Sequence, residues 1–543
     1  MRSYVNRSVG LLAVAVAVAT VISCAGENGE SASAVAIDAD DIGGVVTSAQ
    51  GPEAGVWVVA ETQSLPTPFA RMVVTDDQGQ YVLPDLPDAS YEVFVRGYGL
   101  VDSARVQAMP GQTLDLDAVV APDAAAAAEI YPAAYWLATM DQDLAGCALA
   151  CHQMGTKRTR EIPENITSTT ASSLEAWDKR TAAGPMGQGM GAGFLRLGEE
   201  RQAFADWTDR IANGEIPDQV PPRPAGVERN VVVSVWDWGT KFDGRTDAVA
   251  SDLRDANVNA NGHVYMTSRS SDILAVLDPV EHRAWNLEVP STAPESGDPS
   301  PWSPYFGDDP VWKRNAEPRS LAMDGEGRVW MTAILRESPR DHPEFCTSDT
   351  NKFAQYSPAR AGGGNGRQLL VYNPQGEEFT PIVDTCFSLD HNQMGPGNQL
   401  WFGGRNTVFW MDTDTWDETQ DAEASQGWCP AVVDTNADGT ITEWTEPDEA
   451  IDPAKDHRVE FGCYQIAVDP NDPDGVAWCG EATKLTRVER GPNPPETCKA
   501  EVYRPPTGAM PEVSGAGHAA VDGDGVVWMN WRGSQHFTSF DHR

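Results

Sequence analysis

The stretch Met323-Asp324-Gly325-Glu326-Gly327-Arg328-Val329-Trp330-Met331 decides the fold of this chain, because variants of it recur on both sides. It predicts a strand, an Asp/Gly turn and a second strand with an aromatic residue at a fixed place. The aromatic residues of the other four copies are Tyr265, Trp401, Trp478 and Trp528. A repeated unit of this kind is typical of the blades of a β-propeller. Because the repeats are spaced more widely than ordinary blades of ~40 to 50 residues, we expect six or seven blades with long insertions.

The whole chain predicts a mainly β, multidomain protein. The propeller occupies 229–543 in this interpretation, after a Pro-rich linker over 217–228. Residues 37–122 alternate apolar and polar positions in short runs between turns, which predicts a small β-sandwich. Residues 123–216 carry apolar side chains at three- and four-residue intervals, which predicts a small helical domain.

The N-terminus has the layout of an export signal. Residues 1–23 contain two arginines, no acid and an apolar run that is too short to span a membrane. The run ends in Val21-Ile22-Ser23-Cys24, which resembles a bacterial lipobox and implies lipidation of Cys24; ordinary cleavage nearby is the alternative. Residues 24–36 predict a flexible tether. We therefore expect a bacterial cell-envelope protein, an outer-membrane lipoprotein that faces the periplasm or is exported, with the lipid as its only membrane contact.

The charge of the chain limits its partners. Lys and Arg number 39 and Asp and Glu number 80, for a formal net charge of −41. Polyanions bind proteins where Lys and Arg neutralise them, so nucleic acid is excluded as a partner. The remaining candidates are a redox partner protein with a basic docking face, or a small-molecule or glycan ligand.

Two segments resemble known families. The phrase Thr75-Asp76-Asp77-Gln78-Gly79-Gln80-Tyr81-Val82-Leu83-Pro84-Asp85-Leu86-Pro87 resembles the carboxypeptidase regulatory-like module, a transthyretin-like β-sandwich that serves as a spacer or adhesion unit. The recurring phrase of the last segment resembles virginiamycin B (streptogramin) lyase and NHL-type propellers. The full arrangement is similar to bacterial proteins that join such a sandwich, a haem-type Cys-His motif and this propeller.

The helical segment contains a candidate haem c site. In Cys147-Ala148-Leu149-Ala150-Cys151-His152, two thiols and a following His have the order that covalent haem attachment needs. Three residues separate the cysteines, where the usual motif has two. Met190 or Met186, in a Gly-rich loop, is the expected sixth ligand of a cytochrome c-like domain. The alternative is a Cys147–Cys151 disulfide with an exposed His152.

The other six cysteines lie in the predicted propeller. They show no metal-type spacing, and an even number in an exported domain predicts three disulfides. Fifteen connectivities are open. Adjacency in sequence favours Cys346–Cys386, Cys429–Cys463 and Cys479–Cys498.

A calcium-type loop begins at Asp434. Asp434, Asn436 and Asp438 alternate, and Gly439 and Thr440 follow, as in an EF-hand-like loop. Thr445 stands at the twelfth position, where a bidentate Glu belongs, and Glu443 or Glu446 is the expected substitute. Bound Ca²⁺ with a structural role and a solvated turn are the two interpretations.

The lyase resemblance implies a metal and a general base on one face of the propeller. His518 matches the position of the His that precedes a repeat in that family, and His391 is a second candidate. Either His is otherwise a structural residue.

Three functions remain open. The first is a lipid-anchored haem c protein acting in electron transfer or as a redox-coupled binding or oxidoreductase module. The second is a non-enzymatic carbohydrate or cell-surface binding protein, in which Trp57 or Tyr98 either stacks on a sugar or belongs to the core. The third is a lyase resembling virginiamycin B lyase.

Overall fold

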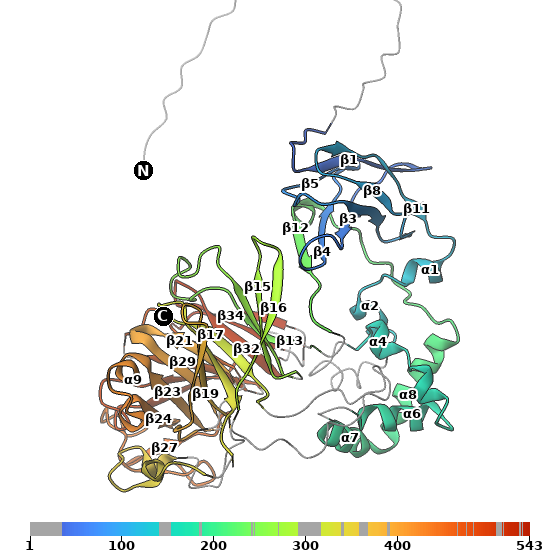
Figure 1. The fold of residues 1–543 in the computed structure, drawn as a ribbon. Helices are drawn as coiled ribbons and strands as arrows, with labels where there is room; N and C mark the ends of the chain where they lie inside the picture. The colour runs from blue at the N-terminus through green and yellow to red at the C-terminus, as the bar shows by residue number, and fades with distance from the viewer. Residues whose placement is uncertain are drawn as a thin grey trace, which may run out of the picture.

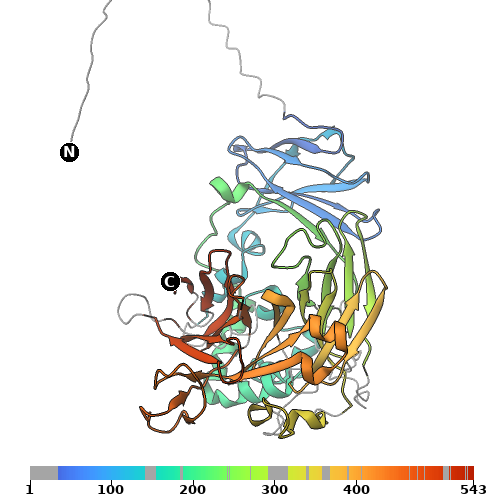
Figure 2. The same ribbon diagram turned by 90° about the vertical axis from the view of Figure 1, so that its left-hand side faces the viewer.

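A computed structural model gives the fold of the chain (Figure 1). The residues that it describes are 35–140, 154–183, 187–240, 243, 245–269, 271–291, 316–337, 341–357, 367–387, 391–404, 406–463, 465–473, 475–481, 483–505, 513, 515–531, 534 and 536–542. They form a β-sandwich, a helical segment and a set of propeller-like sheets. Figure 2 shows the sandwich at one end of the molecule and the propeller sheets at the other.

The sandwich confirms the expectation of a small all-β module. One sheet is built around β1 (Ile42–Ser48), which pairs with β2 (Gly51–Pro52), β5 (Gln80–Leu83), β9 (Gln112–Thr113) and β10 (Leu116–Asp117). The other sheet contains β4 (Phe69–Val74), β3 (Trp57–Thr62), β6 (Tyr91–Arg96) and β8 (Val106–Ala108) in that order. A short pair, β7 (Leu100–Val101) and β11 (Val119–Val120), stands beside them. The core is mostly aliphatic, because alternate strand residues such as Val93 and Val95 face inward, and it also contains Phe69, Tyr81 and Tyr91.

The helical segment is a cluster of short helices. They are α1 (Ala124–Ala128), α2 (Ala133–Leu137), α4 (Lys157–Arg160), α5 (Glu164–Thr167), α6 (Ser173–Thr181), α7 (Gly187–Arg196) and α8 (Gln202–Ala212). The helical character predicted for 123–216 is therefore confirmed in the described part of this segment. Helices α6, α7 and α8 pack around Trp177, Phe194, Phe204 and the fully buried Trp207.

The chain returns to the sandwich before it enters the propeller. In the Pro-rich linker, the Arg223 side chain bonds Glu53 and the carbonyl of Tyr98 at 2.5 and 3.0 Å. Strand β12 (Val232–Trp236) then pairs with β4 along its whole length, at the edge of the sandwich sheet. The sequence places the start of the propeller at 229, whereas these residues complete the sandwich. The sequence could not show this, because a Val-rich strand fits either sheet.

The propeller sheets follow the recurring phrases. Four sheets have four strands each: β13–β16 (Arg245–Val249, Val264–Ser268, Ile273–Asp278, Arg283–Glu288), β17–β20 (Arg319–Met323, Val329–Ile334, Arg367–Asn373, Glu378–Ile382), β21–β24 (Asn392–Gly395, Gln399–Gly403, Thr407–Asp412, Gln426–Pro430) and β28–β31 (Ile466–Val468, Val476–Glu481, Lys484–Glu489, Lys499–Tyr503). The fifth has three: β32 (Ala516–Val521), β33 (Val527–Trp531) and β34 (His536–Phe540). The described residues thus contain five blade-like sheets, where the repeat spacing predicts six or seven. The extra length lies instead in insertions, such as the small sheet of β25 (Val432–Val433), β27 (Asp456–Arg458) and β26 (Trp444–Thr445).

The repeated Asp has a defined structural role. Asp324 accepts hydrogen bonds from the backbone N–H groups of Glu326 and Arg328, and its other oxygen accepts one from the indole of Trp330 at 2.8 Å. Asp522 repeats this pattern with Trp528, also at 2.8 Å. One carboxylate therefore closes the turn and orients the aromatic anchor of the blade.

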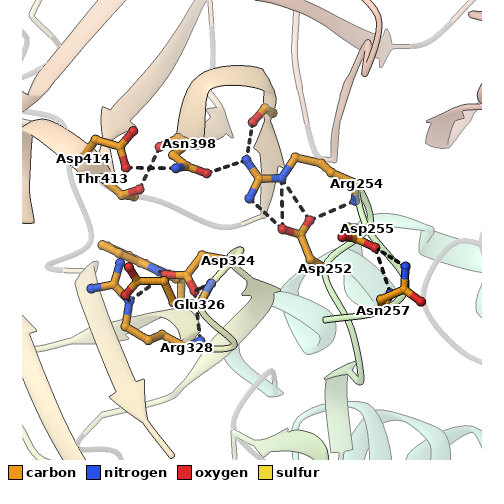
Figure 3. Close-up of polar contacts among 12 residues, drawn as sticks. Asp252, Arg254, Asp255, Asn257, Asp324, Glu326, Arg328, Asn398, Thr413 and Asp414 are labelled. Carbon is orange, nitrogen blue, oxygen red and sulfur yellow. Dashed lines mark hydrogen bonds and ion pairs between the residues drawn. The ribbon is translucent and has the colours of Figure 1, made fainter. Parts of the chain in front are cut away.

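A second contact joins two turns from different propeller sheets (Figure 3). Asp252 holds the Arg254 guanidinium, whose Nη1 donates to the carbonyl of Gly395 at 2.9 Å and to Asn398 Oδ1 at 2.8 Å. The guanidinium thus connects the turn after β13 to the turn after β21.

The disulfides correct two of the three predicted pairs. Cys346–Cys386 is confirmed, whereas Cys429 bonds Cys498 and Cys463 bonds Cys479. Adjacency in sequence failed because Cys463 precedes β28 and Cys479 lies on its partner strand β29, where Ile466 and Cys479 are paired. Such bonds form in an oxidising compartment. In the part of the chain described above, no helix is both long enough and apolar enough to cross a membrane.

Candidate functional site

Each of the five propeller sheets carries a polar residue at an equivalent position near its first strand. In every sheet the aromatic anchor pairs with a residue of the first strand: Val249, Ala322, Gln393, Ala467 and Ala520. Two residues before that partner stand Asp247, Ser320, His391, Gln465 and His518. We call these five residues the polar ring. Both histidines singled out by the sequence belong to it.

β-bulges set three members of the polar ring apart from the regular ladder. The register shifts between Arg245 and Ala248, between Arg319 and Leu321, and between Ala516 and Ala519. Asp247, Ser320 and His518 lie inside these shifts. A bulged residue has no direct cross-strand partner, and bulges commonly re-aim a side chain next to a functional site.

Ser320 also has an unusual backbone conformation. Its φ is +51° and Glu317, three residues earlier, has φ +42°, both in the left-handed region. A buried ion-pair network holds this segment: Arg269 and Arg367 contact the Glu317 carboxylate at 2.8 and 2.6 Å. Residues that the surrounding structure holds in a strained backbone conformation are concentrated at functional sites.

Hydrogen bonds connect three of the first strands at the polar ring. Asp247 Oδ2 accepts from the backbone N–H of Ser320 at 2.9 Å. The Ser320 hydroxyl in turn accepts from the backbone N–H of Asn392 at 2.7 Å. The adjacent His391 is thereby placed with Nδ1 3.9 Å from Asp247 Oδ1, and its side chain is only 15% exposed.

The two histidines lie together. The ring centroids of His391 and His518 are 6.1 Å apart, at an interplanar angle of 55°. The backbone N–H of His518 donates to Asn530 Oδ1 at 2.8 Å, which fixes its strand, and the residue is exposed. A half-buried imidazole beside a carboxylate thus faces an exposed imidazole.

Gln465 contributes a further polar atom. The residue is half-buried, and its Oε1 is buried without a hydrogen-bond partner in the structure. An unpaired buried carbonyl oxygen is costly in a protein interior. It is therefore available to accept a hydrogen bond from a ligand at the ring.

This arrangement suits general acid–base chemistry. Two imidazoles at this distance can contact the same small group, and one of them lies 3.9 Å from a carboxylate. The sequence pointed to both histidines. Asp247, Ser320 and Gln465 were missed, although Ser320, His391 and His518 each stand ten residues before their anchor aromatic, a signal present in the sequence.

The haem candidates are mostly outside the described residues. Cys147, Cys151, His152 and Met186 fall there, as does the lipidation candidate Cys24. Met190 lies on α7 and is half-buried.

The calcium-type loop lies in the insertion between the third and fourth propeller sheets. Asp434, Asn436, Asp438 and Thr440 sit between β25 and β26, and Glu443 follows them. Asn436 Oδ1 accepts from the Asp438 N–H and Asp438 Oδ1 accepts from the Thr440 N–H, so alternate oxygens line one turn.

The aromatic pair of the sandwich does not form an exposed platform. Trp57 and Tyr98 are half-buried and meet edge to face at 4.9 Å. Tyr98 also contacts Tyr131 of the helical segment at 6.0 Å. Both rings therefore belong to the junction between the sandwich and the helices.

Known proteins resemble parts of this chain. Residues 41–121 match the family model of the carboxypeptidase regulatory-like domain. No curated protein matches the chain. Among solved structures, virginiamycin B lyase from Staphylococcus aureus is 11% identical, with a TM-score of 0.28 over 56% of this chain and 71% of the lyase. A putative gluconolactonase is 12% identical, with a TM-score of 0.25 over 52% of this chain and 70% of its own. The segment 41–121 is thus similar to the carboxypeptidase regulatory-like domain.

Proposed function

We propose that this chain is an exported enzyme that cleaves a C–O bond of a small ester or lactone at the polar ring. The observation that carries the proposal is the convergence of Asp247, His391 and His518 from three separate sheets. Side chains so far apart in sequence meet at one place, and two of them are proton-transfer groups.

The residues divide into a base and an acid. In hydrolysis, His391 accepts a proton from a water whose oxygen bonds to the acyl carbon as the C–O bond breaks. In elimination, it accepts a proton from the carbon adjacent to the C–O carbon, and a C=C bond forms as the C–O bond breaks. In both, the Asp247 carboxylate stabilises the imidazolium that forms. His518, more exposed, donates a proton to the leaving oxygen. The base gains one proton and the acid loses one, so the cycle closes by proton exchange with solvent.

A panel of esters and lactones, including a cyclic depsipeptide lactone, tests the proposal with mass-spectrometric detection. We expect His391→Asn and His518→Asn each to lower kcat/KM at least about 100-fold, the usual contribution of one acid–base group. The matched control is His263→Asn, since His263 lies at the turn before β14, outside the polar ring, and should leave the rate unchanged. Reaction in ¹⁸O water separates hydrolysis, which incorporates the label, from elimination, which does not. Cleavage that persists in both variants, or no cleavage by the unaltered protein, would contradict the proposal.

Covalent haem c in the helical segment is a second candidate, with a role in electron transfer. The Cys147/Cys151/His152 motif supports it, together with the half-buried thioether of Met190 on α7. Cys147, Cys151 and His152, with Met190 or Met186, would hold a haem, which would supply one-electron chemistry when bound. A haem stain and a reduced-minus-oxidised spectrum test it on protein matured with haem-attachment machinery, and a missing Soret band excludes it.

We also propose that the chain is exported and that Cys24 is lipidated. The three disulfides support an oxidising compartment. Radiolabelled palmitate incorporation that is lost in Cys24→Ser tests the anchor. A glycan-binding role has less support, because Trp57 and Tyr98 are packed at a domain junction.

A further inference from the structure

We propose that the 434–440 loop binds a Ca²⁺ ion and that Asp456, from β27, supplies the carboxylate that the twelfth position of the loop lacks. The twelfth residue, Thr445, is otherwise engaged: its hydroxyl contacts the carbonyl of Asp456 and His457 Nδ1 at 3.3 and 2.8 Å. The ligand must therefore come from outside the loop.

Asp456 is buried and its carboxylate is unpaired. The residue is 0% exposed, and both carboxylate oxygens are buried without a hydrogen-bond partner in the structure. Asp434 Oδ1 is likewise buried and unpartnered. The N–H groups of Thr435 and Thr442 lie near this carboxylate, but no cation pairs with it in the structure. A buried carboxylate without a cation is costly, and coordination of a metal ion removes that cost.

The surrounding charges increase this cost. Asp434 and Asp438 lie close enough to Asp456 for their negative charges to act on its carboxylate. Three carboxylates thus repel one another around one turn, and a divalent cation between them would reverse that repulsion.

The two acids expected from the sequence are already neutralised by cations. Glu443 lies 3.2 Å from the Lys455 ammonium, and Glu446 lies 3.1 Å from the Arg458 guanidinium. Both acids are exposed. Asp456 is therefore the better-placed hard oxygen ligand.

Ion binding requires a small rearrangement of the loop. Among the described residues, only Asp38, Asp40 and Asp41 have three ligand atoms all within 4.8 Å of one another. Asp438 Oδ1 is held by the N–H and hydroxyl of Thr440, both at 2.8 Å. The Asp438 side chain must turn from Thr440 toward Asp456, as expected of an exposed side chain on a turn.

The test measures Ca²⁺ binding to the full-length protein after treatment with EDTA. Calorimetric titration gives the affinity, and Tb³⁺ luminescence reports the place, because Trp444 on β26 pairs with Asp456 and can sensitise a lanthanide there. We expect Asp456→Asn to weaken Ca²⁺ binding at least about tenfold and to abolish the Tb³⁺ signal. The matched controls Glu443→Gln and Glu446→Gln should bind within about twofold of the unaltered protein.

Folding of Asp456→Asn is checked by circular dichroism in EDTA. If this variant is unfolded, Asp434→Asn serves instead, because Asp434 lies in the 434–440 loop and is only half-buried. Unchanged affinity in the folded variant, loss of binding in a Glu control, or no Ca²⁺ binding by the unaltered protein would each overturn the proposal. This inference is independent of the reaction proposed for the polar ring.

Discussion

The Asp324 carboxylate and the Trp330 indole are joined by a 2.8 Å hydrogen bond across a single β-turn. Asp324 is 2% exposed and also pairs with Arg328, at 2.7 Å. We expect Asp324→Ala to lower the free energy of unfolding by about 3 kcal/mol, because it leaves the buried Trp330 indole and the turn N–H groups without an acceptor. Arg328 would keep its ion pair with Asp417. Differential scanning calorimetry of the propeller transition measures the loss.

Asp522→Ala is the matched comparison for that prediction. Asp522 bonds Trp528 with the same geometry, but Trp528 is 39% exposed, so water replaces the lost bond. We expect a cost of about 1 kcal/mol. Equal costs at the two turns would show that burial does not govern this interaction.

This pair also shows how far the sequence predicts the fold. The Asp-to-aromatic spacing is local, so the phrase at 323–331 predicted strand, turn and anchor correctly. Sheet membership depends on distant partners, and therefore β12 was placed in the wrong sheet. For the same reason six or seven blades were expected where the described residues contain five propeller-like sheets. The disulfide partner of Cys429 depends on the position of the inserted sheet, and no local sequence pattern predicts that position.

The site was predictable only in part for the same reason. His391 and His518 stood out as single residues, but the role of Asp247 depends on a bulge and a contact between sheets.

Asp247→Asn tests whether the carboxylate assists His391 electrostatically. Asn preserves an oxygen that accepts from the Ser320 N–H, so the bulge should persist while the negative charge is lost. We expect kcat to fall about tenfold and KM to change little, with a shifted acidic limb in the pH–rate profile. The change must be smaller than that of His391→Asn; an equal loss would assign Asp247 a direct role in the reaction.

The disulfide pairing predicts a specific peptide map. Non-reducing digestion should yield linked peptides containing Cys429 with Cys498 and Cys463 with Cys479. Peptides that join Cys429 to Cys463 would contradict the structure.

Removal of each bond should differ in cost. The Cys429–Cys498 bond closes a segment of 69 residues and Cys463–Cys479 one of 16. Loop-closure entropy predicts a loss of about 4 kcal/mol for the double Ser variant of the first and about 3 kcal/mol for the second. Thermal melting of the two variants shows which of them loses more stability.

The contact between sandwich and propeller should depend on pH through His282. The Trp236 indole N–H donates to His282 Nδ1 at 3.1 Å, and Phe69 packs on the same imidazole at 4.9 Å. Burial, followed by the charge of Arg71, lowers the pKa of His282 below its ordinary value, although Asp278 and Glu281 oppose the shift. The neutral ring is thus favoured by the folded contact.

The sign of the pH effect follows from this shift. Because the unfolded chain binds a proton at His282 more readily than the folded chain, the stabilisation is complete above the unfolded pKa of about 6.5. It is lost as the pH falls below that value, since protonation removes the acceptor for Trp236. We expect proteolysis at the junction after β12 to accelerate between pH 7 and pH 5. His282→Gln, whose amide oxygen accepts the same bond without titrating, should remove this pH dependence, and a dependence that persists in the variant would assign it to another group.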